Sequence, residues 1–120
     1  MLAVFSNCNQ IYKEKSQLCA TSNFRCLYFF IPDCPACRAN FKPLMKLEDQ
    51  YTTAVLKVEL ILSDPAPDVE VLQETLEKYQ LPTSITYDTT LALAKDFNVT
   101  TTPQCILLDS CGNVIYSGAF

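Results

Sequence analysis

Two cysteines at the junction of two apolar segments constrain this chain more than any other feature. Arg25–Ile31 (RCLYFFI) is apolar and aromatic on both faces, which is typical of a strand buried on both sides in a parallel sheet. Pro32 ends this segment, and Cys34-Pro35-Ala36-Cys37 follows directly. The junction predicts a buried strand whose end delivers a C-x-x-C motif to the start of a helix.

The predicted helix continues from the motif to about Tyr51. Its apolar residues repeat at helical spacing and would form one face: Phe41, Leu44, Leu47 and Tyr51. Pro35 suits the first helical turn, where its missing N–H costs no hydrogen bond. Pro43 lies inside the pattern and predicts a kink.

The remaining segments predict an α/β domain. The expected strands are Ala54–Leu62, a short one at Ser84–Tyr87, and Cys105–Leu108 and Val114–Ser117, which a turn with Gly112 joins. One expected helix has Val69, Leu72, Leu76 and Tyr79 on one face. A second, short helix is expected at Leu91–Phe97, with its cap from Asp88–Thr90. The early strand–helix alternation predicts a parallel pair, and the final hairpin adds antiparallel strands.

Composition limits the class of protein. The 120 residues suit one domain, which we place at residues 24–120 behind an N-terminal extension of residues 1–23. The net charge of −4 without a basic cluster argues against nucleic-acid binding. No apolar run reaches the roughly 18 residues of a membrane span. Membrane attachment is expected only if Cys8, which follows a short apolar run, is lipidated; the shortness of that run favours an ordinary extension.

The residue inventory points to sulfur chemistry. The chain has seven cysteines and no histidine, so it has no imidazole to activate a serine or cysteine or to bind a metal. Its two glycines cannot form a glycine-rich phosphate loop. A zinc site would need four ligands, and Cys105 and Cys111 do not have the spacing of a zinc knuckle. We therefore expect no metal and no cofactor; a structural disulfide remains an alternative use of the motif.

The position of the motif assigns different roles to its two thiols. The N–H groups and dipole at a helix N-terminus favour a thiolate, so Cys34 is expected to be reactive and exposed. Cys37 lies one turn inside the helix and should be shielded. Cys34 would attack a substrate disulfide and Cys37 would resolve the mixed disulfide. The neighbouring Asp33 should raise the pKa of the Cys34 thiol somewhat.

A second element of the expected site is Thr102-Pro103, just before an apolar strand. A cis bond there would turn the chain sharply and expose backbone groups at the strand edge. An extended peptide near Cys34 could then pair with the backbone of Thr102. With Pro35 and Ala36 of the motif, these two residues are the candidate substrate contacts.

These motifs, in this order, resemble the thioredoxin fold. The stretch from Asp88 to Gly118 resembles its redoxin branch, which includes TlpA-like thiol-disulfide oxidoreductases and the AhpC/TSA peroxidases, with the pattern D-x-x-x-x-x-A-x-x-[FY]-x-V-x-x-T-P before a strand–Gly–strand hairpin. The resemblance implies a central mixed sheet flanked by helices. It also implies a cis peptide before Pro103, and Cys34 and Cys37 as nucleophile and resolving thiol of an enzyme acting on protein thiols and disulfides, with a further redox partner.

The sequence departs from this family at three points. Pro43 lies one residue further from the first cysteine than in most relatives, and the final helix that relatives carry after the hairpin is missing. One sheet face could therefore be uncovered, or be covered by a partner or by residues 1–23. Relatives often bury an acid beneath the dithiol, but Arg25–Ile31 contains none. Glu59 is the one acid inside a predicted strand; a charge at a strand edge is its simpler interpretation.

The other cysteines and the competing functions stay open at this point. Cys26 and Cys105 are expected as small core residues, with Cys105 close enough to Pro103 to approach the dithiol, and Cys111 as an exposed turn residue able to pair with Cys8, Cys19 or another chain. A thiol peroxidase is disfavoured, because the threonine and cysteine of P-x-x-x-T-x-x-C fall on Ala36 and Ala39. The lack of histidine argues against a copper carrier, and a non-catalytic binding domain remains an alternative. The resemblance slightly favours the bacterial cell envelope over the cytoplasm.

Overall fold

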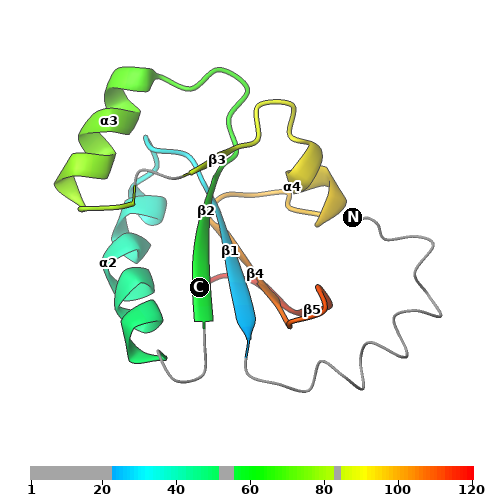
Figure 1. Cartoon of the computed structure of the whole chain (residues 1–120). Helices are drawn as coiled ribbons and strands as arrows, with labels where there is room; N and C mark the ends of the chain where they lie inside the picture. Colours follow the sequence, from blue (N-terminus) through cyan, green and yellow to red (C-terminus); the bar gives the residue numbers. More distant parts are fainter. Residues whose placement is uncertain (1–22, 52–55, 83–84) are drawn as a thin grey trace.

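A computed structural model describes residues 23–51, 56–82 and 85–120 of the chain (Figure 1). These residues form five strands and three helices. In chain order they are β1 (Phe24–Phe30), α2 (Pro35–Gln50), β2 (Leu56–Leu62), α3 (Val69–Lys78), β3 (Thr86–Tyr87), α4 (Ala92–Asp96), β4 (Gln104–Leu108) and β5 (Val114–Gly118).

Strand β1 is the centre of a mixed sheet with the order β3-β2-β1-β4-β5. It pairs in parallel with β2 and antiparallel with β4, while β3 extends the parallel side and β5 the antiparallel side. Five consecutive residues of β1, Cys26 to Phe30, are buried. A strand can bury consecutive residues only where both sheet faces are covered, because successive side chains point to opposite faces. The predicted strand buried on both sides is confirmed.

The helices form two layers around the sheet: α2 and α3 cover one face and α4 covers the other (Figure 1). On the first face, the Phe41 ring of α2 packs edge-on against Tyr28 and Phe30, with ring centroids 5.8 and 5.3 Å away. On the second face, Phe29 packs against Phe97, which follows α4. The aromatic contacts on the first face hold the start of α2 onto β1.

Helix α3 buries most of the predicted face, because Leu72 is buried and Leu76 and Tyr79 pack against the core, but it leaves Val69 exposed. Val69 is its first residue and is 60% exposed, while Leu72 and Thr75 are buried. The buried hydroxyl of Thr75 donates to the carbonyl of Val71 at 2.7 Å, so this polar residue satisfies itself within its own helix. The helical spacing placed Val69 on the buried face because it is apolar. The spacing alone does not indicate that this first residue of the helix stays exposed.

Helix α4 is shorter than the predicted Leu91–Phe97, but its cap comes from Asp88, one of the three residues predicted to provide it. Its N-cap residue Leu91 has a left-handed backbone (φ 62°) and provides no side-chain cap. Instead, the buried Asp88 carboxylate accepts the N–H groups of Leu93 at 3.0 Å and Ala94 at 2.9 Å. Asp88 therefore closes the N-terminus of α4 and fixes this helix to the end of β3.

Beyond α2, the same sheet face is hollowed. No helix follows β5 among the described residues. A cavity of about 630 Å³ lies there, lined by Phe24, Cys26, Leu47, Tyr51, Leu56, Cys105, Leu107, Ile115, Tyr116, Ala119 and Phe120. Tyr51, predicted on the buried face of α2, is half exposed because it borders this cavity.

We expect Asp88→Ala to lower the free energy of unfolding by about 2 kcal/mol, because two N–H groups at the start of α4 lose a charged acceptor. Urea denaturation of the purified protein measures this. The control is Asp96→Ala, an exposed acid at the other end of α4, which should change stability by less than about 0.5 kcal/mol. Equal effects of the two substitutions would contradict the capping role.

Candidate active site

Cys34 is the N-cap of α2. Its backbone is extended (φ −111°, ψ 116°), and its Sγ accepts the backbone N–H of Cys37 at 3.2 Å. Pro35 takes the first helical position, so no N–H is lost there. The sulfur therefore receives a donor and the positive end of the helix dipole, and both favour the thiolate. The side chain is half-buried, which leaves it accessible to a second sulfur.

Cys37 has the opposite environment. It is fully buried, and burial, followed by the hydrogen bond with Cys34, raises the pKa of its thiol to about 12. Cys37 therefore keeps its proton at neutral pH. Both thiols are free, so the pair is present as a dithiol. The two cysteines differ in exposure in the direction that the sequence predicts.

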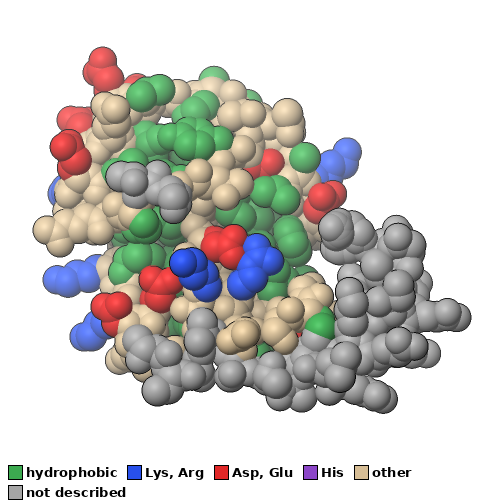
Figure 2. Space-filling view, in the orientation of Figure 1, with side chains coloured by type: hydrophobic (Ala, Val, Ile, Leu, Met, Phe, Trp, Pro, Cys, Tyr) green, Lys and Arg blue, Asp and Glu red, His purple; other side chains and the backbone are tan. Residues whose placement is uncertain are grey.

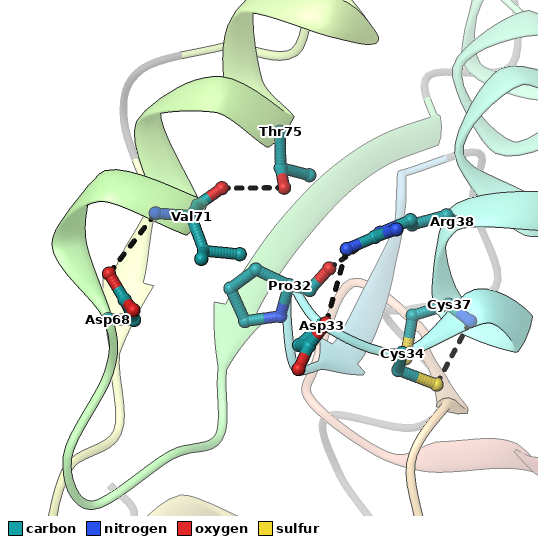
Figure 3. A network of polar contacts seen from close by, with 8 residues as sticks. All are labelled: Pro32, Asp33, Cys34, Cys37, Arg38, Asp68, Val71 and Thr75. Atoms are coloured by element: carbon teal, nitrogen blue, oxygen red, sulfur yellow. Dashed lines mark hydrogen bonds and ion pairs between the residues drawn. The ribbon is translucent and has the colours of Figure 1, made fainter.

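Asp33 and Arg38 form the outer rim of the motif (Figure 3). Arg38 lies 3.4 Å from the Asp33 carboxylate, and its Nε donates to the carbonyl of Pro32 at 2.9 Å. Across from this rim, Figure 3 shows Asp68, the N-cap of α3, with Val71 and Thr75 of the same helix. The Asp33 charge is thus opposed by a guanidinium at the rim of the motif.

Tyr28 of β1 lies beneath the dithiol, and sequence reasoning missed it. Its hydroxyl donates to the carbonyl of Cys37 at 2.9 Å, and its side chain is fully buried. It also lies within electrostatic range of the thiols of Cys34, Cys37 and Cys105. The signal was present in the sequence, because a tyrosine in a strand buried on both sides needs a partner for its hydroxyl.

Glu59 does not lie beneath the dithiol. It forms an ion pair with Arg25, and the second guanidinium nitrogen donates to its carboxylate at 3.0 Å. Both residues line a cavity on the α4 side of the sheet, together with Leu93 and Phe97. Figure 2 shows acidic and basic side chains side by side over the region of β1 and β2. The simpler interpretation, a strand-edge charge, is the right one for Glu59.

Among the described residues, the three cysteines outside the motif do not join it. Cys26 and Cys105 are buried and free, as predicted for core residues, and the Cys105 thiol donates to Cys26, which lowers the pKa of Cys26. Cys111 is half-buried rather than exposed, and it is disulfide-bonded. Within this turn, the Asp109 carboxylate accepts the N–H of Cys111 at 2.9 Å. Cys8 and Cys19 lie outside the described residues.

The described residues contain no group of three or more potential ligands that could hold a metal ion. Cys34 and Cys37 would be two ligands of a site that needs four.

The predicted substrate contacts lie around the same end of the sheet. Gln104, the first residue of β4, pairs with Phe29 near the end of β1, which leads into the dithiol. The peptide bond between Thr102 and Pro103 is cis, as the resemblance implied, and both residues are half-buried. Pro35 and Ala36 are exposed on the first turn of α2.

Comparison with known proteins places this geometry in a family. The model of the Redoxin family matches residues 8–119. The chain belongs to the Redoxin family. No curated protein matches the sequence significantly. The expected redoxin membership and oxidoreductase class are therefore confirmed at the level of the family.

Solved structures of similar shape share the fold of this redoxin. A thiol-disulfide oxidoreductase from Bacteroides fragilis matches with a TM-score of 0.69 at 22% identity, over 83% of this chain and 74% of its own. StoA from Bacillus subtilis matches with 0.68 at 19% identity, over 86% and 79%. A secreted disulfide oxidoreductase from Mycobacterium tuberculosis matches with 0.63 at 21% identity, over 78% and 67%. The thioredoxin-like fold is thus confirmed.

We expect iodoacetamide at pH 7 to alkylate Cys34 of the reduced redoxin and to spare Cys37 in the folded state. The reason is that Cys37 is buried and protonated, with its pKa raised to about 12, whereas Cys34 is accessible. Peptide mass spectrometry after timed alkylation measures both rates. Because Cys37 becomes a thiolate only as the pH approaches 12, its labelling should stay slow up to the pH at which the protein unfolds. Labelling of Cys37 as fast as Cys34 at pH 7 would contradict this difference.

Proposed function

We propose that this redoxin exchanges thiols and disulfides with protein substrates, with Cys34 as the nucleophile and Cys37 as the resolving thiol. The observation that carries the proposal is the unequal pair: a half-buried sulfur that accepts an N–H at a helix N-terminus, 3.2 Å from the backbone of a fully buried second cysteine. Exchange needs one accessible thiolate and one protected thiol that acts only after the first has reacted.

In the reducing direction the steps balance as follows. The Cys34 thiolate attacks one sulfur of a substrate disulfide, and a mixed disulfide forms as the other substrate sulfur leaves as a thiolate that takes up a proton. The Cys37 thiol then loses its proton to the departing sulfur and attacks Cys34 Sγ. The products are a Cys34–Cys37 disulfide and a substrate dithiol, so two electrons pass from the protein to the substrate. A redox partner would reverse these steps to regenerate the dithiol.

Substrate binding is proposed at the edge next to the dithiol. An extended segment can pair with the backbone of Thr102 by adding a strand, and Pro103 would pack against it. Pro35 and Ala36 are exposed on the outer side of the motif and would border the substrate sulfur. Because backbone pairing recognises no particular side chain, such a site suits varied polypeptides.

The bacterial cell envelope is the proposed location. One protein of similar shape is described as secreted. In the described part of the chain, no helix is long and apolar enough to cross a bilayer. Lipidation of Cys8, which would attach the protein to a membrane, concerns a residue outside the described ranges.

We expect Cys34→Ser to abolish reduction of insulin disulfides, because it removes the only nucleophile of the first step. Cys37→Ser should instead accumulate a stable mixed disulfide between Cys34 and the substrate, because nothing resolves it. Turbidity of reduced insulin reports turnover, and non-reducing gels with peptide mass spectrometry report the trapped species.

The matched control is Cys26→Ala, which removes a buried free thiol outside the motif. It should keep most of the turnover. Loss of turnover in Cys26→Ala equal to that in Cys34→Ser, or a mixed disulfide on any cysteine other than Cys34, would overturn the assignment of roles.

A further inference from the structure

The hydroxyl of Tyr28 is a buried polar group that the exchange steps do not use. It comes from the central strand, below the first turn of α2, and donates to the carbonyl of Cys37 at 2.9 Å. The backbone N–H of the same residue donates to the Cys34 sulfur at 3.2 Å. The carbonyl of Cys37 is thus hydrogen-bonded to a residue of β1, and its N–H is hydrogen-bonded to the sulfur of Cys34.

We propose that Tyr28 is a positioning residue for the dithiol, which fixes the Cys37 carbonyl from β1 and thereby holds the Cys37 N–H on the Cys34 sulfur. This inference rests on the proposed function, since it concerns the reactivity of the same nucleophile. A donor held in place stabilises a thiolate better than one that moves, because no reorganisation is needed when the charge appears.

Ring packing alone does not explain this tyrosine. Its ring stacks on Phe30 at 6.2 Å and meets the edge of Phe41 at 5.8 Å, and phenylalanine would make the same contacts. A buried hydroxyl is costly unless it is hydrogen-bonded, so phenylalanine would be the simpler residue for packing. The hydroxyl is therefore the part of Tyr28 that serves the dithiol.

Tyr28 serves as a fixed donor and not as a proton acceptor. Burial is the main cause that raises its pKa; a side-chain hydrogen bond with Asn40 offsets part of this rise, and the nearby thiols raise the pKa further. The titratable groups that face it are Cys34 and Cys37 from α2 and Cys105 from β4. Because the raised pKa keeps the hydroxyl protonated, Tyr28 remains a hydrogen-bond donor through the neutral and mildly alkaline range. A buried carboxylic acid in the same place would gain or lose its charge as the pH changes, whereas the Tyr28 hydroxyl stays neutral.

The test is the pH profile of Cys34 alkylation in the full-length reduced protein, with and without Tyr28→Phe. In Tyr28→Phe the Cys37 carbonyl loses a neutral hydrogen bond, so we expect the Cys37 N–H to be held less firmly on the Cys34 sulfur and the pKa of Cys34 to rise by roughly half a unit. Alkylation below that pKa should slow about threefold. The control is Tyr79→Phe, which removes a hydroxyl from a ring packed against the same Phe41 from α3. It should leave the profile unchanged.

Two further variants separate the hydroxyl from packing and from folding. Replacing Tyr28 with 4-methylphenylalanine fills the space of the hydroxyl without a donor and should shift the profile as phenylalanine does. Replacing Tyr28 with 4-aminophenylalanine restores a donor and should return the profile towards that of the wild type. A lower melting temperature with an unchanged Cys34 pKa would mean a purely structural role and would overturn the proposal. Alkylation requires no turnover, so a wild-type protein that reduces no insulin would overturn the proposed function alone.

Discussion

The seating of α2 on the end of β1 is the contact on which the candidate site depends. Phe41 packs edge-on against two aromatic rings of β1, and the Tyr28 hydroxyl reaches the first turn of the helix. These contacts fix the position of the first turn of the helix. That position in turn places the Cys37 N–H, which donates to the Cys34 sulfur. A strand buried on both faces is needed for this, because only a central strand can support a helix on one side while α4 closes the other.

At this one junction the two cysteines acquire different environments, and among the described residues it is the hydroxyl of Tyr28 that bonds to the motif from β1. Cys34 lies at the helix end with a donor and access to solvent, and Cys37 lies one turn further, where burial raises its pKa to about 12. The acid available inside a strand, Glu59, is paired with Arg25 on the other side of the sheet. In this redoxin a neutral hydroxyl takes the place beneath the dithiol, which separates the stabilisation of the nucleophile from proton acceptance.

Much of this arrangement could be predicted from the sequence, because the strongest signals are local. The run Arg25–Ile31 and the motif after it located β1 and the start of α2 to within one residue. Features set by tertiary contacts could not be read in this way. Val69 is apolar but exposed, Tyr51 borders a cavity instead of packing, and Tyr28 matters through a hydrogen bond to a residue nine positions away. In each case the deciding partner is defined only once the elements pack.

The most direct measurement is the redox equilibrium of the motif itself. The purified protein is equilibrated with glutathione buffers, its thiols are trapped by alkylation, and Cys34 and Cys37 are quantified by peptide mass. We expect a reversible Cys34–Cys37 disulfide with a reduction potential between about −120 and −270 mV, the range of working oxidoreductases. A disulfide that resists reduction below about −300 mV, or two thiols that never pair, would contradict a catalytic dithiol and leave a structural member of the fold.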